Sequence, residues 1–173
     1  MGSEAGASQP AMNGEDRAHA DEVQRALDRA LRALALRAHS EQEIVDKLTR
    51  AGYDEHIIAE TMAKLSEYSL TDDPSFASQW ANSRARRGMG PWRIARELRE
   101  KGVSREDADA AIAELDQDAA LDTAIQLAEK QLRKGDARAQ RRAYETLIRR
   151  GYDYDMAREA LRTAGANLEE EDE

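Results

Sequence analysis

Apolar residues recur at helical spacing along most of the chain, and one short pattern occurs three times. In each copy, a leucine that ends an amphipathic stretch is followed four positions later by a glycine. The pairs are Leu48 with Gly52, Leu98 with Gly102, and Leu147 with Gly151, so that successive glycines are 50 and 49 residues apart. Three matches at a nearly constant period indicate an internal repeat.

The residues after each glycine predict where the next helix begins. An apolar residue comes first, then Asp or Ser, then a further amphipathic stretch. Glycine readily adopts the left-handed conformation that ends a helix, and Asp or Ser accepts hydrogen bonds from the first backbone N–H groups of the next helix. The predicted N-caps are Asp54, Ser104 and Asp153. Ser40 with Glu43 forms a further predicted capping box.

A longer helical stretch precedes each of these helix pairs, at residues 23–38, 74–87 and 118–134. Leu27, Leu31 and Leu34 form the predicted core stripe of the first stretch. The sequence therefore predicts three tandem three-helix repeats, at residues 23–66, 67–116 and 117–166. Because such units are small and share contacts with their neighbours, we expect an elongated, curved array.

Composition supports an all-α fold and excludes several kinds of site. The chain has 32 alanines, whereas Val, Ile and Thr together number only 16, and strands depend on β-branched residues. The absence of cysteine excludes disulfides, thiolate metal sites and cysteine nucleophiles. No apolar run is long enough to span a membrane, and the acidic N-terminal segment does not resemble a signal peptide. We therefore expect a soluble cytoplasmic protein.

The formal charge of -9 is confined to the two ends of the chain. Residues 1–22 carry a net charge of -4 and residues 167–173 a net charge of -5, which leaves residues 23–166 neutral. Both ends lack large apolar residues, so we predict that they are disordered. They could act only as solubilising ends, or they could shield a basic surface.

Two segments of the neutral body are strongly basic. Residues 84–101 and residues 133–150 each contain seven basic and two acidic side chains, a net charge of +5, and they occupy corresponding parts of repeats two and three. Arginine pairs well with carboxylate or phosphate groups. The segments could be solvated helix faces, but together they predict a binding surface. The candidate residues are Arg84, Arg86, Arg87, Arg93, Arg96, Lys101, Arg133, Lys134, Arg138, Arg141, Arg142, Arg149 and Arg150.

The central segment resembles the signature of the RecX family of recombinase regulators. The family pattern reads Leu-x-Asp-Asp, Phe-Ala, Arg, Gly-x-Gly, Arg-Ile, Glu-Leu and Lys-Gly, and all of these occur in order between residues 70 and 103. Arg149, Arg150, Gly151 and Tyr152 resemble its closing element. The likeness extends over about residues 25 to 165. Pro74 departs mildly from the pattern, at a position in the first helical turn that tolerates proline.

The resemblance implies a function in recombination. Members of the family bind the filament of the RecA recombinase on DNA, reduce its ATP hydrolysis and strand exchange, and favour filament shrinkage. RecA is therefore the expected partner, with weak binding to single- or double-stranded DNA a further possibility. We expect a monomer, since a protein that binds a polymer through one face needs no self-association. The alternatives are a small helix-turn-helix DNA-binding module and a helical scaffold for another protein.

The sequence offers no catalytic, metal or cofactor site, so we expect no enzyme activity. The three histidines are isolated, and no phosphate-binding or nucleophile motif is present. Asp72 and Asp73 suit a helix N-terminus better than a metal site. Trp80 and Trp92 could stack on nucleic-acid bases, but both lie at amphipathic spacing beside apolar residues, so we expect them to pack in the core or between repeats. The glycines at positions 88 and 90 predict a hinge between helices, with Pro91 in the first turn of the next helix.

Overall fold

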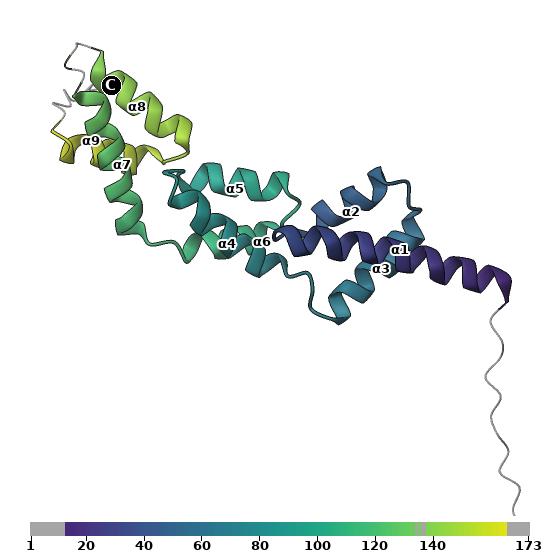
Figure 1. The fold of residues 1–173 in the computed structure, drawn as a ribbon. Helices are drawn as coiled ribbons and strands as arrows, with labels where there is room; N and C mark the ends of the chain where they lie inside the picture. The colour runs from purple at the N-terminus through teal and green to yellow at the C-terminus, as the bar shows by residue number, and fades with distance from the viewer. Residues whose placement is uncertain (1–12, 134, 136–137, 166–173) are drawn as a thin grey trace, which may run out of the picture. The chain divides into compact units, whose positions relative to one another are not determined.

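The computed structural model describes residues 13–133, 135 and 138–165. These residues form helices and no strand, which confirms the all-α prediction (Figure 1). The helices follow one another in three sets of three. The sets are α1 Gly14–Leu36, α2 Glu41–Arg50 and α3 Glu55–Glu67; α4 Asp73–Ala85, α5 Pro91–Glu100 and α6 Arg105–Ala113; and α7 Gln117–Leu132, α8 Ala139–Arg150 and α9 Tyr154–Thr163.

The described chain divides into two compact units. Unit 1 contains the residues up to His39 together with Glu43–Thr71, and unit 2 contains Ser40–Gln42 and the residues from Asp72 onward. Unit 1 therefore holds the first helix set, except for the beginning of α2, and unit 2 holds the second and third sets. The elongated, curved arrangement of all three sets stays a prediction.

The joint between the last two helices of each set has the predicted geometry. Gly52, Gly102 and Gly151 have φ angles of 87°, 79° and 90°, in the left-handed region. In every copy, the N–H of the residue after the glycine donates to the carbonyl oxygen of the repeated leucine, at 3.1 to 3.3 Å. This bond satisfies a carbonyl that the helix end would otherwise leave unpaired.

Of the predicted N-caps Asp54, Ser104 and Asp153, two accept the expected hydrogen bonds. The side chains of Ser104 and Asp153 accept hydrogen bonds from the backbone N–H groups of Asp107 and Met156. Asp54 occupies the N-cap position of α3, but its side chain makes no capping bond. The three copies therefore share their backbone path more closely than their side-chain contacts.

Each helix set has its own hydrophobic core. In the first set, the buried stripe of α1 consists of Val23, Ala26, Ala30 and Ala33, so the predicted stripe of leucines is only partly right. Leu27 and Leu34 flank the core and are partly buried, whereas Leu31 is exposed. Small alanine side chains let α1 lie close to its neighbours. The longer leucines on either side then cover the edges of the contact.

The prediction of disorder across residues 1–22 is wrong from Gly14 onward, because α1 begins there. Asn13 caps the helix by accepting a hydrogen bond from the N–H of Asp16 at 2.8 Å. Acidic side chains in this first turn are stabilised by the positive end of the helix dipole. His19 then ties the early part of α1 to α3 through a contact of 2.7 Å with Glu60. Residues 1–12 and the acidic segment 167–173 lie outside the described residues.

Candidate binding surface

The second and third helix sets meet where the N-terminal end of α5 touches the C-terminal end of α8, a contact named here the α5–α8 junction (Figure 1). The N–H of Gly90 donates to the carbonyl oxygen of Arg150 at 2.8 Å, and the N–H of Trp92 donates to that of Gly151 at 3.0 Å. A helix N-terminus has unpaired donors and a helix C-terminus has unpaired acceptors. The N–H donors at the start of α5 and the carbonyl acceptors at the end of α8 therefore satisfy each other's hydrogen bonds.

Glycine is required on both sides of the α5–α8 junction. A Cβ atom at Gly90 would collide with the backbone of Gly151, and one at Gly151 would collide with Arg93. Gly88 has a φ angle of 72° and faces side chains of the third helix set, among them Leu127. The glycines at positions 88 and 90, predicted as a hinge, thus also permit close backbone contact between two repeats.

Arg150 belongs to this junction as a structural residue. Its Nη1 donates to the carbonyl oxygens of Arg87 and Gly88, at 3.1 and 3.0 Å. This guanidinium fastens the end of α8 to the loop between α4 and α5. Arg149, the preceding residue of α8, is exposed. The two basic segments predicted from the sequence therefore meet in unit 2.

Glu97 neutralises two other predicted site residues. Its carboxylate oxygens lie 2.6 Å from Nε of Arg84 and 3.1 Å from Nε of Arg93. Partial burial favours the neutral form of Glu97, but the hydrogen bond from Arg93 and the positive charge of Arg84 outweigh it, and the pKa of Glu97 is lowered. Arg84 and Arg93 are therefore engaged within the second helix set.

Trp80 packs as predicted, whereas the prediction for Trp92 is wrong. Trp80 is half-buried against the core of the second set, and the charged groups of Arg84 and Lys101 lie 4.5 and 4.1 Å from the centre of its ring. The side chain of Trp92 is 71% exposed. Ile94 defines the buried face of α5, and Trp92 lies about 200° away from it at ~100° per residue.

The remaining predicted arginines differ in how far their charge is already paired. Arg96 and Arg141 form exposed ion pairs with glutamates one turn ahead. Arg138 and Arg142 have interactions of their own. Lys134 lies outside the described residues. Four side chains are exposed and form no ion pair with any described residue: Arg86, Arg87, Arg133 and Arg149.

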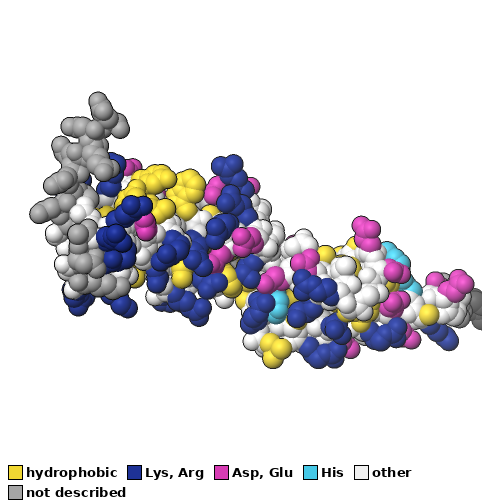
Figure 2. Space-filling view, turned by 90° about the horizontal axis from the view of Figure 1, so that it is seen from above, with side chains coloured by type: hydrophobic (Ala, Val, Ile, Leu, Met, Phe, Trp, Pro, Cys, Tyr) yellow, Lys and Arg dark blue, Asp and Glu magenta, His cyan; other side chains and the backbone are white. Residues whose placement is uncertain are grey.

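We name the side chains of Arg86, Arg87 and Arg149 the basic surface, because all three lie within two residues of the Arg150 hydrogen bonds. In the space-filling view, Lys and Arg side chains crowd the part of unit 2 that contains α5 and α8 (Figure 2). Each unpaired guanidinium offers several N–H donors to a phosphate or carboxylate. Anion binding is therefore the chemistry available at this surface.

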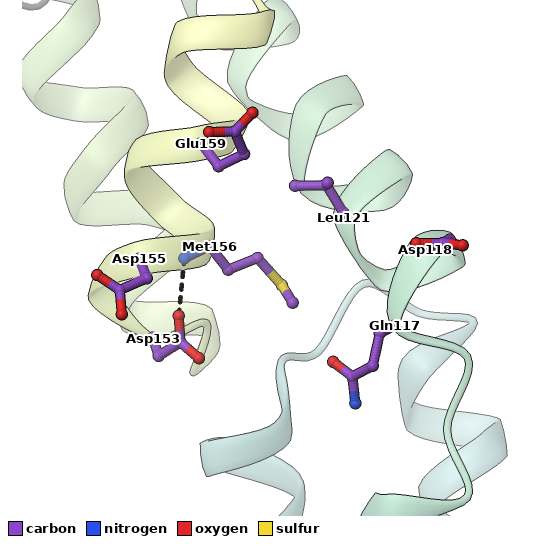
Figure 3. Close-up of a pocket in the computed structure, with 7 residues that line it drawn as sticks. All are labelled: Gln117, Asp118, Leu121, Asp153, Asp155, Met156 and Glu159. Atoms are coloured by element: carbon purple, nitrogen blue, oxygen red, sulfur yellow. Dashed lines mark hydrogen bonds between the residues drawn. The ribbon is translucent and has the colours of Figure 1, made fainter.

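A shallow cavity elsewhere in unit 2 has the opposite character. It measures about 430 Å³, lies between the N-terminal parts of α7 and α9, and is lined partly by the apolar side chains of Leu121 and Met156. Its carboxylates would repel a phosphate, and those of Asp118 and Asp155 point away on opposite sides (Figure 3). Asp153 is engaged in capping α9. Across the described residues, no group of three acidic or histidine side chains could hold a metal ion.

Comparison with known proteins identifies the family. Models of the first, second and third three-helix domains of RecX match residues 26–65, 72–112 and 117–161. The chain is 38% identical to a regulatory protein RecX from Mycobacterium sp. (strain JLS), covering 84% of this chain and 80% of that protein. The chain belongs to the RecX family. This confirms the resemblance seen in the central segment, and with it the three tandem three-helix domains.

Other RecX proteins agree with this assignment. The regulatory protein RecX of Halorhodospira halophila is also 38% identical, over 84% of this chain and 89% of its own length. The crystal structure of RecX from Lactobacillus salivarius shares the fold, with a TM-score of 0.78 at 23% identity over 84% of this chain and 97% of the other. None of the described helices is both long and apolar enough to cross a membrane.

Sequence reasoning missed two features of this RecX surface. It gave Arg150 the same role as its neighbours, since no pattern reveals that a side chain will reach the carbonyls of a loop 62 residues away. It also overlooked the exposure of Trp92 and Tyr154. For Trp92, a signal was present, because the helical period places it opposite the buried face of α5.

Proposed function

We propose that this protein regulates recombination and DNA repair by binding the filament of the RecA recombinase on DNA and inhibiting its ATP hydrolysis, strand exchange and growth. Membership of the RecX family supports this role. The structural observation that carries the proposal is the α5–α8 junction, which gathers exposed arginines from two repeats at one place in unit 2. A DNA-bound filament presents phosphates and acidic side chains, the groups that arginine binds best.

The mechanism is differential binding. A regulator changes filament assembly only to the extent that it binds one filament state more tightly than another. The basic surface supplies contacts that do not depend on a change inside the protein, because Arg86, Arg87 and Arg149 are already exposed. Inhibition then follows if these contacts favour a filament state that hydrolyses ATP slowly or loses subunits.

The direct test is the ATPase rate of a preformed RecA filament on single-stranded DNA, measured over a range of protein concentrations. We expect the wild-type protein to lower the rate, and the triple variant R86A/R87A/R149A to need at least about tenfold more protein for the same effect. The reason is that hydrogen bonds to charged groups contribute ~1.5–3 kcal/mol each. Half-inhibition concentration is the quantity to compare.

The matched control is R25A/R29A/R32A, which removes from α1 three exposed arginines that form no ion pair with any described residue. It loses the same charge and should inhibit like the wild type. Inhibition by the basic-surface variant at wild-type concentrations, with unchanged circular dichroism, would exclude this surface. A wild-type protein that alters neither ATP hydrolysis nor filament length would refute the function itself.

A further inference from the structure

Two large apolar side chains are exposed among the described residues of unit 2, one in the first turn of α5 and one at the start of α9. They are Trp92, 71% exposed, and Tyr154, 66% exposed. Trp92 donates its backbone N–H to Gly151, and Tyr154 follows Gly151 by three residues. A single exposed aromatic is ordinary on a protein surface. Trp92, however, lies at the contact between two helices whose segments each carry a net charge of +5, and an exposed aromatic ring in such a place indicates a binding site.

The backbone beneath Trp92 is held firmly. Hydrogen bonds from the N–H groups of Gly90 and Trp92 to α8 anchor it on both sides, and the close approach at Gly151 leaves no room for a side chain at position 90. The exposure of the indole is therefore a property of an ordered helix end and not of a loose loop. A ligand that used this ring would pay little to order the backbone.

The solvent-exposed face of α5 continues from Trp92 with arginines. Residues at positions i, i+4 and i+7 lie on one side of a helix, and here they are Trp92, Arg96 and Arg99, all exposed. Arg96 lies 3.5 Å from Glu100, but an exposed ion pair of this kind contributes little stability and can be exchanged for a phosphate. This face thus offers one aromatic ring followed by two cations at successive turns.

We propose that the α5–α8 junction binds single-stranded nucleic acid, with Trp92 stacking on a base and the arginines of α5 and of the basic surface binding the phosphates. The inference deepens the proposed function, on which its biological role rests, by naming the DNA strand as a ligand of this surface. Aromatic stacking combined with a basic track is how proteins hold single strands without reading their sequence. In a duplex the bases are stacked inside, so the ring of Trp92 could not reach them.

The same ring could in principle enter a pocket on a protein. Protein interfaces, however, place their aromatic anchors inside a continuous apolar core with a polar rim. On the exposed face of α5, the residues one and two turns ahead of Trp92 are Arg96 and Arg99. Charged neighbours suit a ligand that alternates flat bases with phosphates. If Trp92 contacted a protein instead, W92A would bind oligothymidylate like the wild type.

The test measures binding of the full-length protein to a fluorescent oligothymidylate, by anisotropy and without recombinase. We expect W92A to bind about tenfold or more weakly than the wild type, since stacking contributes ~1–3 kcal/mol per base, and W92F to bind nearly as well as the wild type. An abasic oligomer of the same length should bind wild type and W92A equally. The matched control Y68A removes an exposed aromatic of unit 1, 67% exposed, and should bind normally.

Tryptophan fluorescence gives an independent readout, because W92F retains only Trp80. Oligothymidylate should quench the wild type and leave W92F unquenched. Equal affinity of W92A and the wild type for oligothymidylate, or equal quenching of the wild type and W92F, would overturn the proposal. If W92A binds oligothymidylate normally yet fails to inhibit the RecA filament, Trp92 contacts protein, and the proposal falls while the proposed function stands.

Discussion

Glu97 pairs with two arginines of the basic segment 84–101 and so reduces the positive charge that the segment offers for binding. It holds Arg84 and Arg93 at 2.6 and 3.1 Å and is itself largely buried, with 13% of its side chain exposed. Arg84 is therefore used to hold α4 against α5, and Arg93 pairs with Glu97 within α5. The side chains of Arg86 and Arg87, in the loop beyond, remain exposed. Counting charges along the sequence does not separate these two roles.

We predict that E97Q lowers the free energy of unfolding by ~1–3 kcal/mol at neutral pH, because two guanidinium groups lose a charged partner. The folded chain holds the pKa of Glu97 below its ordinary value of 4.5. A lowered pKa means that the stabilisation is complete above about pH 4.5 and is lost as the pH falls through the lower value of the folded state. Denaturant titrations between neutral and acidic pH measure both effects.

The control for this prediction is E100Q, which removes a carboxylate that is 67% exposed from its pair with Arg96. It should change stability little at any pH, since exposed pairs contribute little. If E97Q and E100Q unfold alike, or if E97Q remains as sensitive to acid as the wild type, Glu97 does not hold α4 and α5 together.

At the scale of helices, the α5–α8 junction joins two repeats through groups that helix ends leave unpaired. Gly90 and Trp92 donate to α8, and Arg150 donates back to the loop before α5. Within each repeat, the helices pack through apolar faces instead. The junction is therefore polar and directional, which fixes how α8 approaches α5. Its geometry decides where Arg149 lies relative to Arg86.

We predict that R150A loosens the α5–α8 junction without unfolding either repeat. Loss of two hydrogen bonds to loop carbonyls should speed hydrogen exchange at the amides of Gly90 and Trp92 by about tenfold or more. Amides in the middle of α8 should keep their protection. Exchange measured by nuclear magnetic resonance resolves these sites.

R149A is the matched control, since its side chain is exposed and forms no ion pair with the described residues. It should leave the exchange of both amides unchanged and yet weaken anion binding. Unchanged protection in R150A would show that the backbone hydrogen bonds hold the junction alone. Arg150 would then be available as a binding residue, as the sequence predicted.

At the scale of the whole chain, the acidic total conceals where binding can occur. The net charge of -9 belongs to residues 1–22 and 167–173, and residues 23–166 are neutral. Within that neutral body, exposed arginines meet at the α5–α8 junction, and carboxylates line the cavity between α7 and α9. An anionic ligand is therefore attracted to one part of unit 2 and repelled by another. The net charge of the chain reveals neither the basic part nor the acidic part.

We predict that single-strand binding depends on salt through the basic surface. Each arginine that neutralises a phosphate of a single strand contributes about 0.7 to the slope of log affinity against log salt concentration. The variant R86A/R87A should therefore bind oligothymidylate with a slope smaller by about 1.4. Anisotropy titrations at several salt concentrations determine the slope.

R29A/R32A provides the control, with the same loss of charge from exposed positions of α1. Its slope should match that of the wild type. Equal slopes of log affinity against log salt concentration for the wild type and R86A/R87A would mean that these two arginines do not bind phosphate, whatever the affinity of the protein.

The helices and their repetition could be predicted from local sequence, because the physics involved is local. Helical period, alanine content, the left-handed glycines and the capping residues each depend on neighbours a few positions away. Gly151 has the predicted left-handed conformation, and Asp153 makes the predicted capping bond. The start of α1 was missed because Asn13 and Glu60 stabilise a segment whose composition alone suggests disorder.

The binding surface was determined only in part by the sequence. Clustered arginines revealed that repeats two and three carry basic segments, but only the tertiary structure decided which of them are exposed. Arg84 and Arg150 are engaged by groups 13 and 62 residues away, Glu97 and the Gly88 carbonyl. Trp92 is exposed because Ile94 and Leu98 take the core side of α5. Such assignments depend on contacts between distant segments, and the order of residues along the chain does not encode them locally.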